Sequence, residues 1–318
     1  MLKSKFIAAG VFLLLIGLAG ELLGRYFGLT SFPLYEASDA YEYIHAPNQK
    51  VRIYGNWYIT NEHSMRSKPL SEADSTIILL IGDSLINGGN ATDHDSLAST
   101  MLEISLSDYF NSNVRVLNIA EGSWGPDNAA AYIKERGVFN ADMIMLVFSS
   151  ADAFDNMQHE PIVGVHGQYP DKQAFIAWEK IIEKGWGRIL EYSGVKHDKK
   201  KNTDLTIKAA EVFNPGFEKF KQLSDSSSIP LHFYLHVGQD ELEKGMLQDS
   251  GKLIVDFCRK NGIPYTIELD RNINKTHYID KIHYNNRGQK FLAENLFPII
   301  RDKIMNKHGL IAAKENPR

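Results

Sequence analysis

Short apolar segments alternate with amphipathic helical patterns along this chain, and this alternation limits the available folds more than any other feature. Each apolar segment is nearly continuous, as expected for a strand that is buried on both faces of a sheet. The expected strands are 76–81, 114–119, 143–148, 231–237 and 264–267, and the expected helices are 96–110, 127–136, 172–191, 205–223, 241–260 and 287–307. The pattern predicts an α/β fold, a doubly wound parallel sheet of about five strands flanked by helices.

The N-terminal segment 1–28 predicts a hydrophobic helix. Lys3 and Lys5 precede an uncharged apolar run at 6–20, which Glu21 ends. The run alone is short for a membrane span, but it reaches the required length if the span extends to residue 27. We expect a retained membrane anchor. A cleaved signal sequence, with a small-x-small pattern at 17–19, and a buried core helix are the alternatives.

The charge distribution predicts where the rest of the chain lies. A basic N-terminal end stays on the cytoplasmic side, so the remaining residues are exported. The expected location is therefore the inner or plasma membrane with a periplasmic or extracellular domain, or a secreted form after cleavage. The formal net charge of −4 gives no basic excess for nucleic acid, so no nucleic-acid partner is expected. The single cysteine, Cys258, excludes an intrachain disulfide and a cysteine-based zinc site.

Four regions follow from the pattern. Residues 29–72 are rich in turn formers and form a lead-in or linker that packs on the main domain, which covers 73–310. The stretch at about 157–225 is too long for a simple crossover, so we expect a helical insertion there. Residues 311–318 form a tail.

Polar residues that directly follow the predicted strands are candidates for a site, because ligands of such sheets bind outside the carboxyl ends of the strands. Gly82-Asp83-Ser84 follows the first strand, and its alternative role is to cap a helix. Gly122, Ser123 and Trp124 follow the second, where a simple turn before a helix is the alternative. After the third come Ser149, Ser150, Ala151, Asp152 and Asn156, with Asp152 as an alternative helix cap.

Asp280 and His283 follow the last strand and are three residues apart. This spacing lets the carboxylate accept a hydrogen bond from one imidazole nitrogen and leaves the other nitrogen free as a base. The alternative is a surface turn before the last helix. His232, His236 and His277 are assigned to packing or to the surface.

Together, Gly82-Asp83-Ser84 near the start and Asp280-x-x-His283 near the end resemble the SGNH (GDSL) hydrolase superfamily over about 75–305. The segment with Asn61 and Arg66 resembles the one that precedes this serine motif in membrane-anchored bacterial members. The resemblance implies a flavodoxin-like fold, with Ser84 as nucleophile, His283 as base and Asp280 as its orienting partner. It implies no metal and no cofactor.

The middle motifs depart from the family pattern. The resemblance places the oxyanion hole at the N–H groups of Ser84 and Ser123, with Gly122 beside them. Ala151 stands where the family usually has an asparagine that donates to the oxyanion. Losing one such donor costs about 2.7–4 kcal/mol. Candidate replacements are the polar side chains of Ser150, Asn156, Asn128 and Asn87.

The expected function is a serine esterase or O-acyl (acetyl) transferase that acts on an ester of an envelope or extracellular glycan through an acyl-serine intermediate. The alternatives are a catalytically impaired glycan-binding or assembly protein and a lipase- or thioesterase-like hydrolase. The residues expected to contact the glycan or acyl-ester substrate are Asp83, Trp124, Ser150, Ala151, Asp152 and Asn156.

Overall fold

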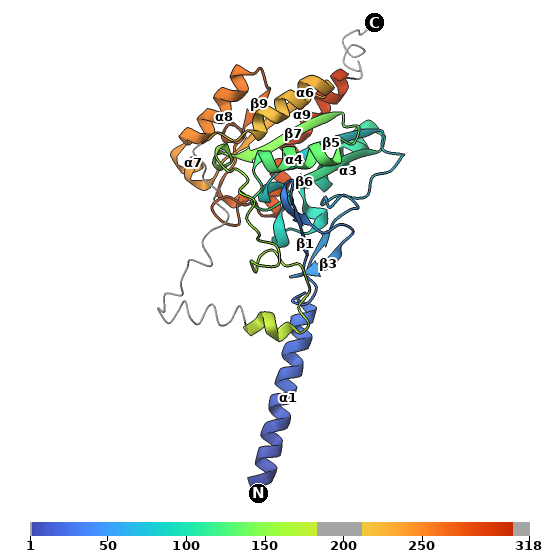
Figure 1. The fold of residues 1–318 in the computed structure, drawn as a ribbon, viewed down its shortest axis with the longest axis vertical. Helices are drawn as coiled ribbons and strands as arrows, with labels where there is room; N and C mark the ends of the chain where they lie inside the picture. Colours follow the sequence, from blue (N-terminus) through green and yellow to red (C-terminus); the bar gives the residue numbers. More distant parts are fainter. Residues whose placement is uncertain (1, 183–211, 308–318) are drawn as a thin grey trace.

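A five-stranded parallel sheet forms the centre of the protein. The computed structural model describes residues 2–182 and 212–307. The strands stand in the order β6-β5-β7-β8-β9 (Figure 1), and their bounds are β5 Thr76–Gly82, β6 Val114–Ala120, β7 Met143–Ser149, β8 Leu231–His236 and β9 Tyr265–Ile267. The predicted α/β class is confirmed, and the expected strands are correct to within about a residue at most of their ends.

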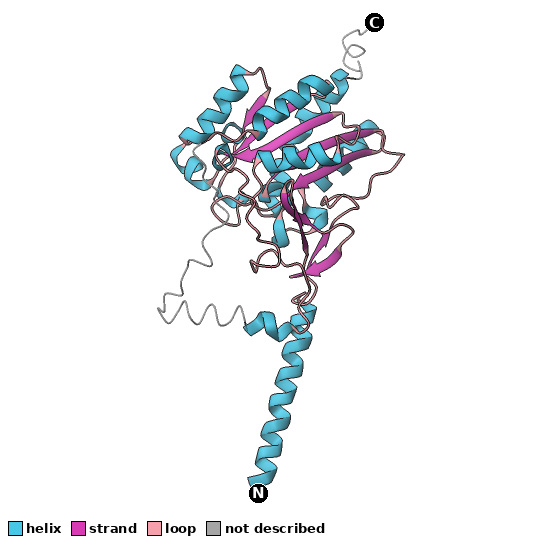
Figure 2. Ribbon diagram, viewed as in Figure 1, coloured by secondary structure: helices cyan, strands magenta, loops and turns pink. Residues whose placement is uncertain are grey.

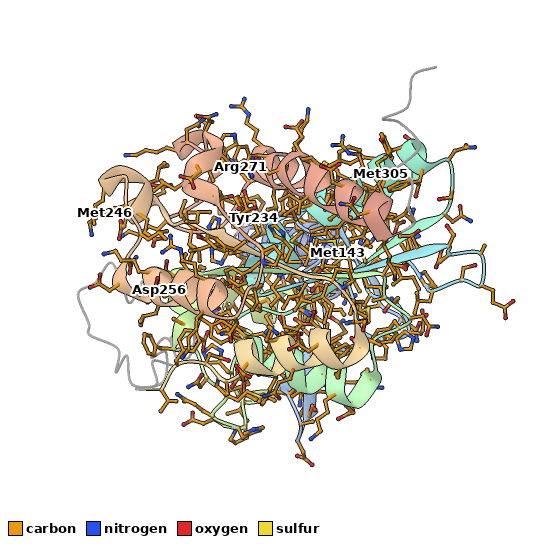
Figure 3. All side chains as sticks on the ribbon, turned by 90° about the horizontal axis from the view of Figure 1, so that it is seen from above. Met143, Tyr234, Met246, Asp256, Arg271 and Met305 are labelled. Carbon is orange, nitrogen blue, oxygen red and sulfur yellow. The ribbon has the colours of Figure 1, made fainter. Side chains whose placement is uncertain are left out.

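Helices cover both faces of the sheet (Figure 2). Alternate strand residues point to opposite sides, so Leu79 and Ile81 enter one core and Ile78 and Leu80 the other. The first core lies under α4 (Pro126–Arg136), α6 (Gly216–Ser227) and α8 (Asp249–Lys260), and the second under α2 (Ser84–Asn87), α3 (Ala98–Phe110) and α9 (Asn286–Lys307). Figure 3 shows Met143 and Tyr234 in the densely packed centre of the molecule.

Three expected helices differ from the observed ones. The pattern at 241–260 is interrupted at Gly245, which adopts a φ of 63°, so that α7 (Gln239–Lys244) and α8 are separate. A helix begins at 177 rather than 172 and is described to 182. In place of the helix predicted at 205–223, α6 begins at Gly216. Residues 183–211 lie outside the described part of the chain.

The lead-in contains two antiparallel hairpins that the sequence did not indicate. The first pairs β1 (Tyr35–Ser38) with β2 (Glu42–His45), and the second pairs β3 (Lys50–Ile53) with β4 (Asn56–Ile59). Every residue of β2 is buried against the main domain. Short 3₁₀ turns complete the described elements: η1 Gly89–Ala91, η2 His94–Ser96, η3 Ser150–Ala153, η5 Glu268–Arg271 and η6 Lys275–His277.

Helix α1 (Leu2–Tyr26) projects away from the sheet domain, as Figure 1 shows. Its segment Lys5–Tyr26 is long and apolar enough to cross a membrane, and its most apolar window has no buried residues. Length and composition fit an anchor or a signal sequence, and the exposure argues against a buried core helix.

Candidate active site

Ser84, His283 and Asp280 lie side by side at the carboxyl edge of the sheet. Ser84 begins α2 directly after β5, and its Oγ lies 2.9 Å from His283 Nε2. His283 Nδ1 lies 2.8 Å from Asp280 Oδ2. The His283 and Asp280 side chains are 42% and 54% exposed, so a substrate can reach the group from solvent. The two ends of the domain therefore meet in the serine–imidazole–carboxylate order that activates a serine hydroxyl.

The Asp280 carboxylate is held by its own loop. Its Oδ1 accepts hydrogen bonds from the Ile282 N–H at 2.9 Å and the His283 N–H at 2.8 Å. Partial burial opposes ionisation, but these two backbone donors and the His283 side chain together lower the pKa of Asp280. The carboxylate thus stays charged and its other oxygen faces the imidazole.

A buried network behind this loop fixes its position. His236 Nε2 donates to the Ile282 carbonyl at 2.8 Å, next to His283, and His236 Nδ1 lies 2.6 Å from Glu268 Oε2. Tyr284 donates to the other oxygen of Glu268 and lies 2.7 Å from His236 Nδ1. His236 was predicted to have only a packing or surface role, and Glu268 was not among the predicted site residues. Their role depends on contacts between distant segments, which no local motif reveals.

The loop after β6 carries two candidate backbone donors, the N–H groups of Gly122 and Ser123. The N–H groups of Ser84, Gly122 and Ser123 donate to no group among the described residues. Ser123 has a φ of 61°, in the left-handed region that favours glycine. The serine that replaces the expected glycine therefore keeps the glycine-like conformation.

Residues of the first hairpin hold this loop. Glu121 accepts from the His45 N–H at 2.9 Å and lies 2.5 Å from His45 Nδ1. The Tyr43 hydroxyl donates to the Gly122 carbonyl at 2.7 Å. None of the three residues Tyr43, His45 and Glu121 was a predicted site residue. They act as supports for the candidate oxyanion loop.

The motif after β7 does not supply an obvious side-chain donor. Ala151 is exposed, and Ser150 is buried, with its Oγ donating to Glu241 Oε1 at 2.6 Å. Asp152 accepts from both the N–H and the hydroxyl of Ser149, at 2.7 and 2.8 Å. Asp152 thus has the capping role that the sequence left open. Burial raises the pKa of Asp152 to about 6, against these hydrogen bonds.

The asparagines expected to replace the missing donor are engaged elsewhere. The Asn87 amide donates to the Ala120 carbonyl and to Tyr58, and the Asn128 amide to the Tyr41 carbonyl and to Glu42. The Asn156 amide donates to the Val212 carbonyl at 2.9 Å. Within the described part of the chain, the side-chain donors of Asn87, Asn128 and Ser150 are all engaged, whereas this contact uses only one of the two N–H groups of the Asn156 amide.

Trp124 was expected to contact the substrate, and this expectation needs correction. Trp124 is fully buried, its indole N–H donates to the Tyr43 carbonyl at 3.0 Å, and its ring packs against Tyr41 and Tyr132. An aromatic residue in an edge loop can pack in the core or line a binding surface, and Trp124 packs in the core.

Asp83 accepts a hydrogen bond from the Leu85 N–H at 2.9 Å as the N-cap of α2. Burial, followed by the neighbouring Asp152, raises its pKa well above the usual range.

Buried Arg66 organises the loop that follows Ser84. Its guanidinium donates to the carbonyls of Asn87 at 2.5 Å, Gly89 at 2.9 Å and Thr92 at 3.1 Å, and it stacks over Tyr58. Planar, multiple donation of this kind is specific to arginine. The Asn61–Arg66 segment thus connects the lead-in to the nucleophile loop.

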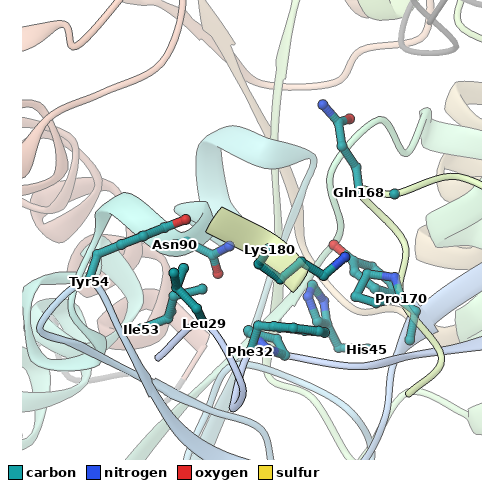
Figure 4. Close-up of a pocket in the computed structure, with 12 residues that line it drawn as sticks. Leu29, Phe32, His45, Ile53, Tyr54, Asn90, Gln168, Pro170 and Lys180 are labelled. Atoms are coloured by element: carbon teal, nitrogen blue, oxygen red, sulfur yellow. The ribbon is translucent and has the colours of Figure 1, made fainter. Parts of the chain in front are cut away.

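Two cavities adjoin the site. One of about 260 Å³ is lined by Ser84, Asp280 and His283, with the loop 88–91. A larger one of about 500 Å³, shown in Figure 4, lies between the lead-in and the insertion, and its lining residues include Phe32, His45, Tyr54 and Lys180. Asn90 lines both cavities, so the larger space borders the loop that follows Ser84.

Comparison with known proteins gives similarities of fold at low sequence identity. No protein-family model matches the chain, and no curated protein matches its sequence. A lipase/acylhydrolase from Enterococcus faecalis has 10% identity and a TM-score of 0.41, over 72% of this chain and 96% of its own. TesA has 11% identity and a TM-score of 0.44, over 72% and 99%. An acetyl-xylooligosaccharide esterase from Geobacillus has 12% identity and a TM-score of 0.39, over 74% and 96%.

Proposed function

We propose that this protein is a serine-dependent ester hydrolase or acyltransferase of the SGNH (GDSL) type. The observation that carries the proposal is the contact of Ser84 Oγ with His283 Nε2 at 2.9 Å, with Asp280 on the opposite ring nitrogen at 2.8 Å. A serine hydroxyl is a weak nucleophile at neutral pH and needs such a base.

The mechanism follows from these positions. His283 Nε2 takes the Ser84 proton as Oγ bonds to the ester carbonyl carbon, and Asp280 stabilises the resulting imidazolium. The imidazolium then gives its proton to the leaving alcohol as the ester C–O bond breaks, which leaves an acyl-Ser84 ester. His283 next takes the proton of an incoming hydroxyl as its oxygen bonds to the acyl carbon. The imidazolium then returns the proton to Ser84 Oγ as the acyl–Oγ bond breaks, which frees Ser84. Water as the incoming group gives an esterase, and a sugar hydroxyl gives an acyltransferase.

The oxyanion that forms during these steps needs hydrogen-bond donors. The N–H groups of Ser84, Gly122 and Ser123 are the donors that we assign to it, because they have no partner among the described residues. The side-chain donor of the usual third motif is missing at Ala151. We therefore expect slower turnover than in an enzyme with a complete set, by up to about 10²–10³.

An ester of an envelope or extracellular glycan is the substrate class that we propose. The larger cavity supports it, because aromatic rings of Phe32 and Tyr54 share the lining with the hydrogen-bonding side chains of His45 and Asn90. Its volume of about 500 Å³ is within the usual range of small-molecule sites. A sugar ring offers both apolar faces and hydroxyl groups to such a lining.

We also propose that α1 is a retained anchor that leaves the domain on the exported side. Cleavage after Ala19 would remove Gly17, whose carbonyl accepts a hydrogen bond from the Trp178 indole at 2.7 Å. A removable signal sequence has no reason to contact the mature domain in this way. Recovery of the intact N-terminus from the membrane fraction would support the anchor, and a mature chain that starts at residue 20 would refute it.

Covalent labelling by a fluorophosphonate probe tests the catalytic proposal. The wild-type protein should react, and Ser84→Ala should not. A matched control is Ser226→Ala, at an exposed serine of α6, which should label like the wild type. Absence of labelling in the folded wild-type protein would instead favour a glycan-binding protein that has lost catalysis, the alternative that the alanine at position 151 supports.

A further inference from the structure

The segment 175–182 of the insertion is bound to the second half of α1, although the two are far apart in sequence. The Trp178 indole donates to the Gly17 carbonyl at 2.7 Å, and Arg25 Nη2 donates to the Phe175 carbonyl at 3.0 Å. Gly17, Gly20 and Gly24 fall on one face of α1 at i, i+3 and i+7. A Cβ on Gly20 would collide with the Trp178 ring, so the glycine allows this close approach.

Glu21, which ends the uncharged run of α1, is part of the same contact. Its Oε2 accepts from the N–H groups of Ala177 at 2.9 Å and Trp178 at 3.4 Å, and its Oε1 accepts from Arg25 at 2.7 Å. The first N–H groups of a helix lack partners within the helix, and a carboxylate satisfies them well. Glu21 therefore caps the helix that begins at 177, which gives this charge a structural role at the end of an apolar run.

The bound helix is amphipathic. At 100° per residue, Ala177, Trp178, Ile181 and Ile182 fall on one side, and Glu179 and Lys180 fall on the other. Phe175 is 88% exposed and Ile182 is 58% exposed. Both side chains are therefore exposed and apolar and lie next to α1, whose own apolar residues are also exposed.

The depth in the bilayer at which Trp178 contacts α1 determines whether lipid or water surrounds these side chains. If Trp178 and Gly17 were both in water, only residues 2–16 would be left to span the bilayer. A helix of this length measures about 22 Å at 1.5 Å per residue. This is less than the ~30 Å of a bilayer core. With Glu21 at the interface, Gly17 lies about 6 Å deeper, within the ~5–10 Å depth of interfacial helices.

We propose that the segment 175–182 lies in the headgroup region of the lipid bilayer that α1 spans, with Phe175 and Ile182 toward the acyl chains. The proposal rests on retention of α1, as argued above, but not on catalysis. Tryptophan is enriched at this depth, and the polar side of the helix faces water. Lys180 also lines the larger cavity, so this cavity begins beside the membrane surface.

Spin labels on the full-length protein test the location. A single cysteine at Phe175→Cys or Ile182→Cys, in a Cys258→Ala background, is labelled in phosphatidylcholine–phosphatidylglycerol vesicles. The measurement is the ratio of collisions with oxygen, which concentrates in lipid, to collisions with a water-soluble nickel chelate. Leu14→Cys on α1, at a leucine that is 72% exposed and lies deeper than Glu21, gives the lipid reference. Leu253→Cys on α8, at a leucine that is 46% exposed, gives the water reference.

The ratios at 175 and 182 should approach the value at 14 and exceed that at 253. Ratios equal to that at 253 would overturn the proposal. Gly20→Leu should displace Trp178 and shift the label at 175 toward the water value, and no shift would show that the contact with α1 does not hold the segment in place. Fluorophosphonate labelling of Ser84 is read in the same samples, so failure of the membrane contact and failure of catalysis are distinguished.

Discussion

Asp280→Asn is the substitution that tests the catalytic geometry most directly. Asp280 Oδ1 accepts two backbone N–H groups, and Oδ2 faces His283 Nδ1. In the variant, the amide oxygen can keep both backbone donors, which turns the amide NH₂ group toward Nδ1. That nitrogen must then accept, so the ring proton moves to Nε2, and His283 can no longer take the Ser84 proton. We expect kcat to fall by about 10⁴, a loss of about 5 kcal/mol of transition-state stabilisation.

Steady-state hydrolysis of p-nitrophenyl acetate measures this change. The fold should survive, because Asp280 is more than half exposed and its backbone contacts are kept. Asp249→Asn is a matched control, since Asp249 is an exposed aspartate paired with Lys252 on α8, and it should leave kcat unchanged. Retention of more than a tenth of the wild-type kcat in Asp280→Asn would refute the assignment of Asp280 as the group that sets the tautomer of His283.

Three further predictions concern the supports of the site. Ala151→Asn should raise kcat for p-nitrophenyl acetate by up to about 10²–10³ if a side-chain oxyanion donor is what the site lacks; an unchanged kcat would contradict this reading. Arg66→Lys should lower the free energy of unfolding by at least about 2 kcal/mol in urea titrations, because buried carbonyls lose their donors, whereas the exposed Arg259→Lys should change it little. The pKa of Asp152 is raised to about 6 from 3.8, so its protonated form favours the fold and its contribution is lost as the pH rises from about 4 through 6. Asp152→Asn should remove up to about 3 kcal/mol of that pH dependence, and parallel stability profiles of variant and wild type would count against it.

The sheet could be predicted from the sequence because its strands are buried on both faces. Such strands leave continuous apolar runs, and the observed β5, β6 and β7 extend each predicted strand by only one residue. The hairpins of the lead-in were missed for the opposite reason. Their four-residue strands include exposed positions, and β3 alternates in burial over too short a length to give a clear period.

The local motifs of the site could also be found, whereas their supports could not. Asp280 and His283 are three residues apart, so their contact is encoded in one turn. Glu268 and His236 meet only after β8 and β9 pair, and neither residue has a neighbour in sequence that indicates this. Trp124 was misassigned because its position in an edge loop does not show which way the side chain points.

The lead-in is as much a part of the site as the sheet edge. Arg66 holds three carbonyls of the loop after Ser84, and the first hairpin holds the candidate oxyanion loop through Tyr43 and His45. The parallel sheet places the ends of β5 and β6 at one edge but leaves the conformations of the following loops open. Because an oxyanion donor must be placed before the reaction begins, rigid support of both loops is expected to contribute to the proposed catalysis without any contact to the substrate. Segments outside the recognisable motifs therefore determine how well those motifs work.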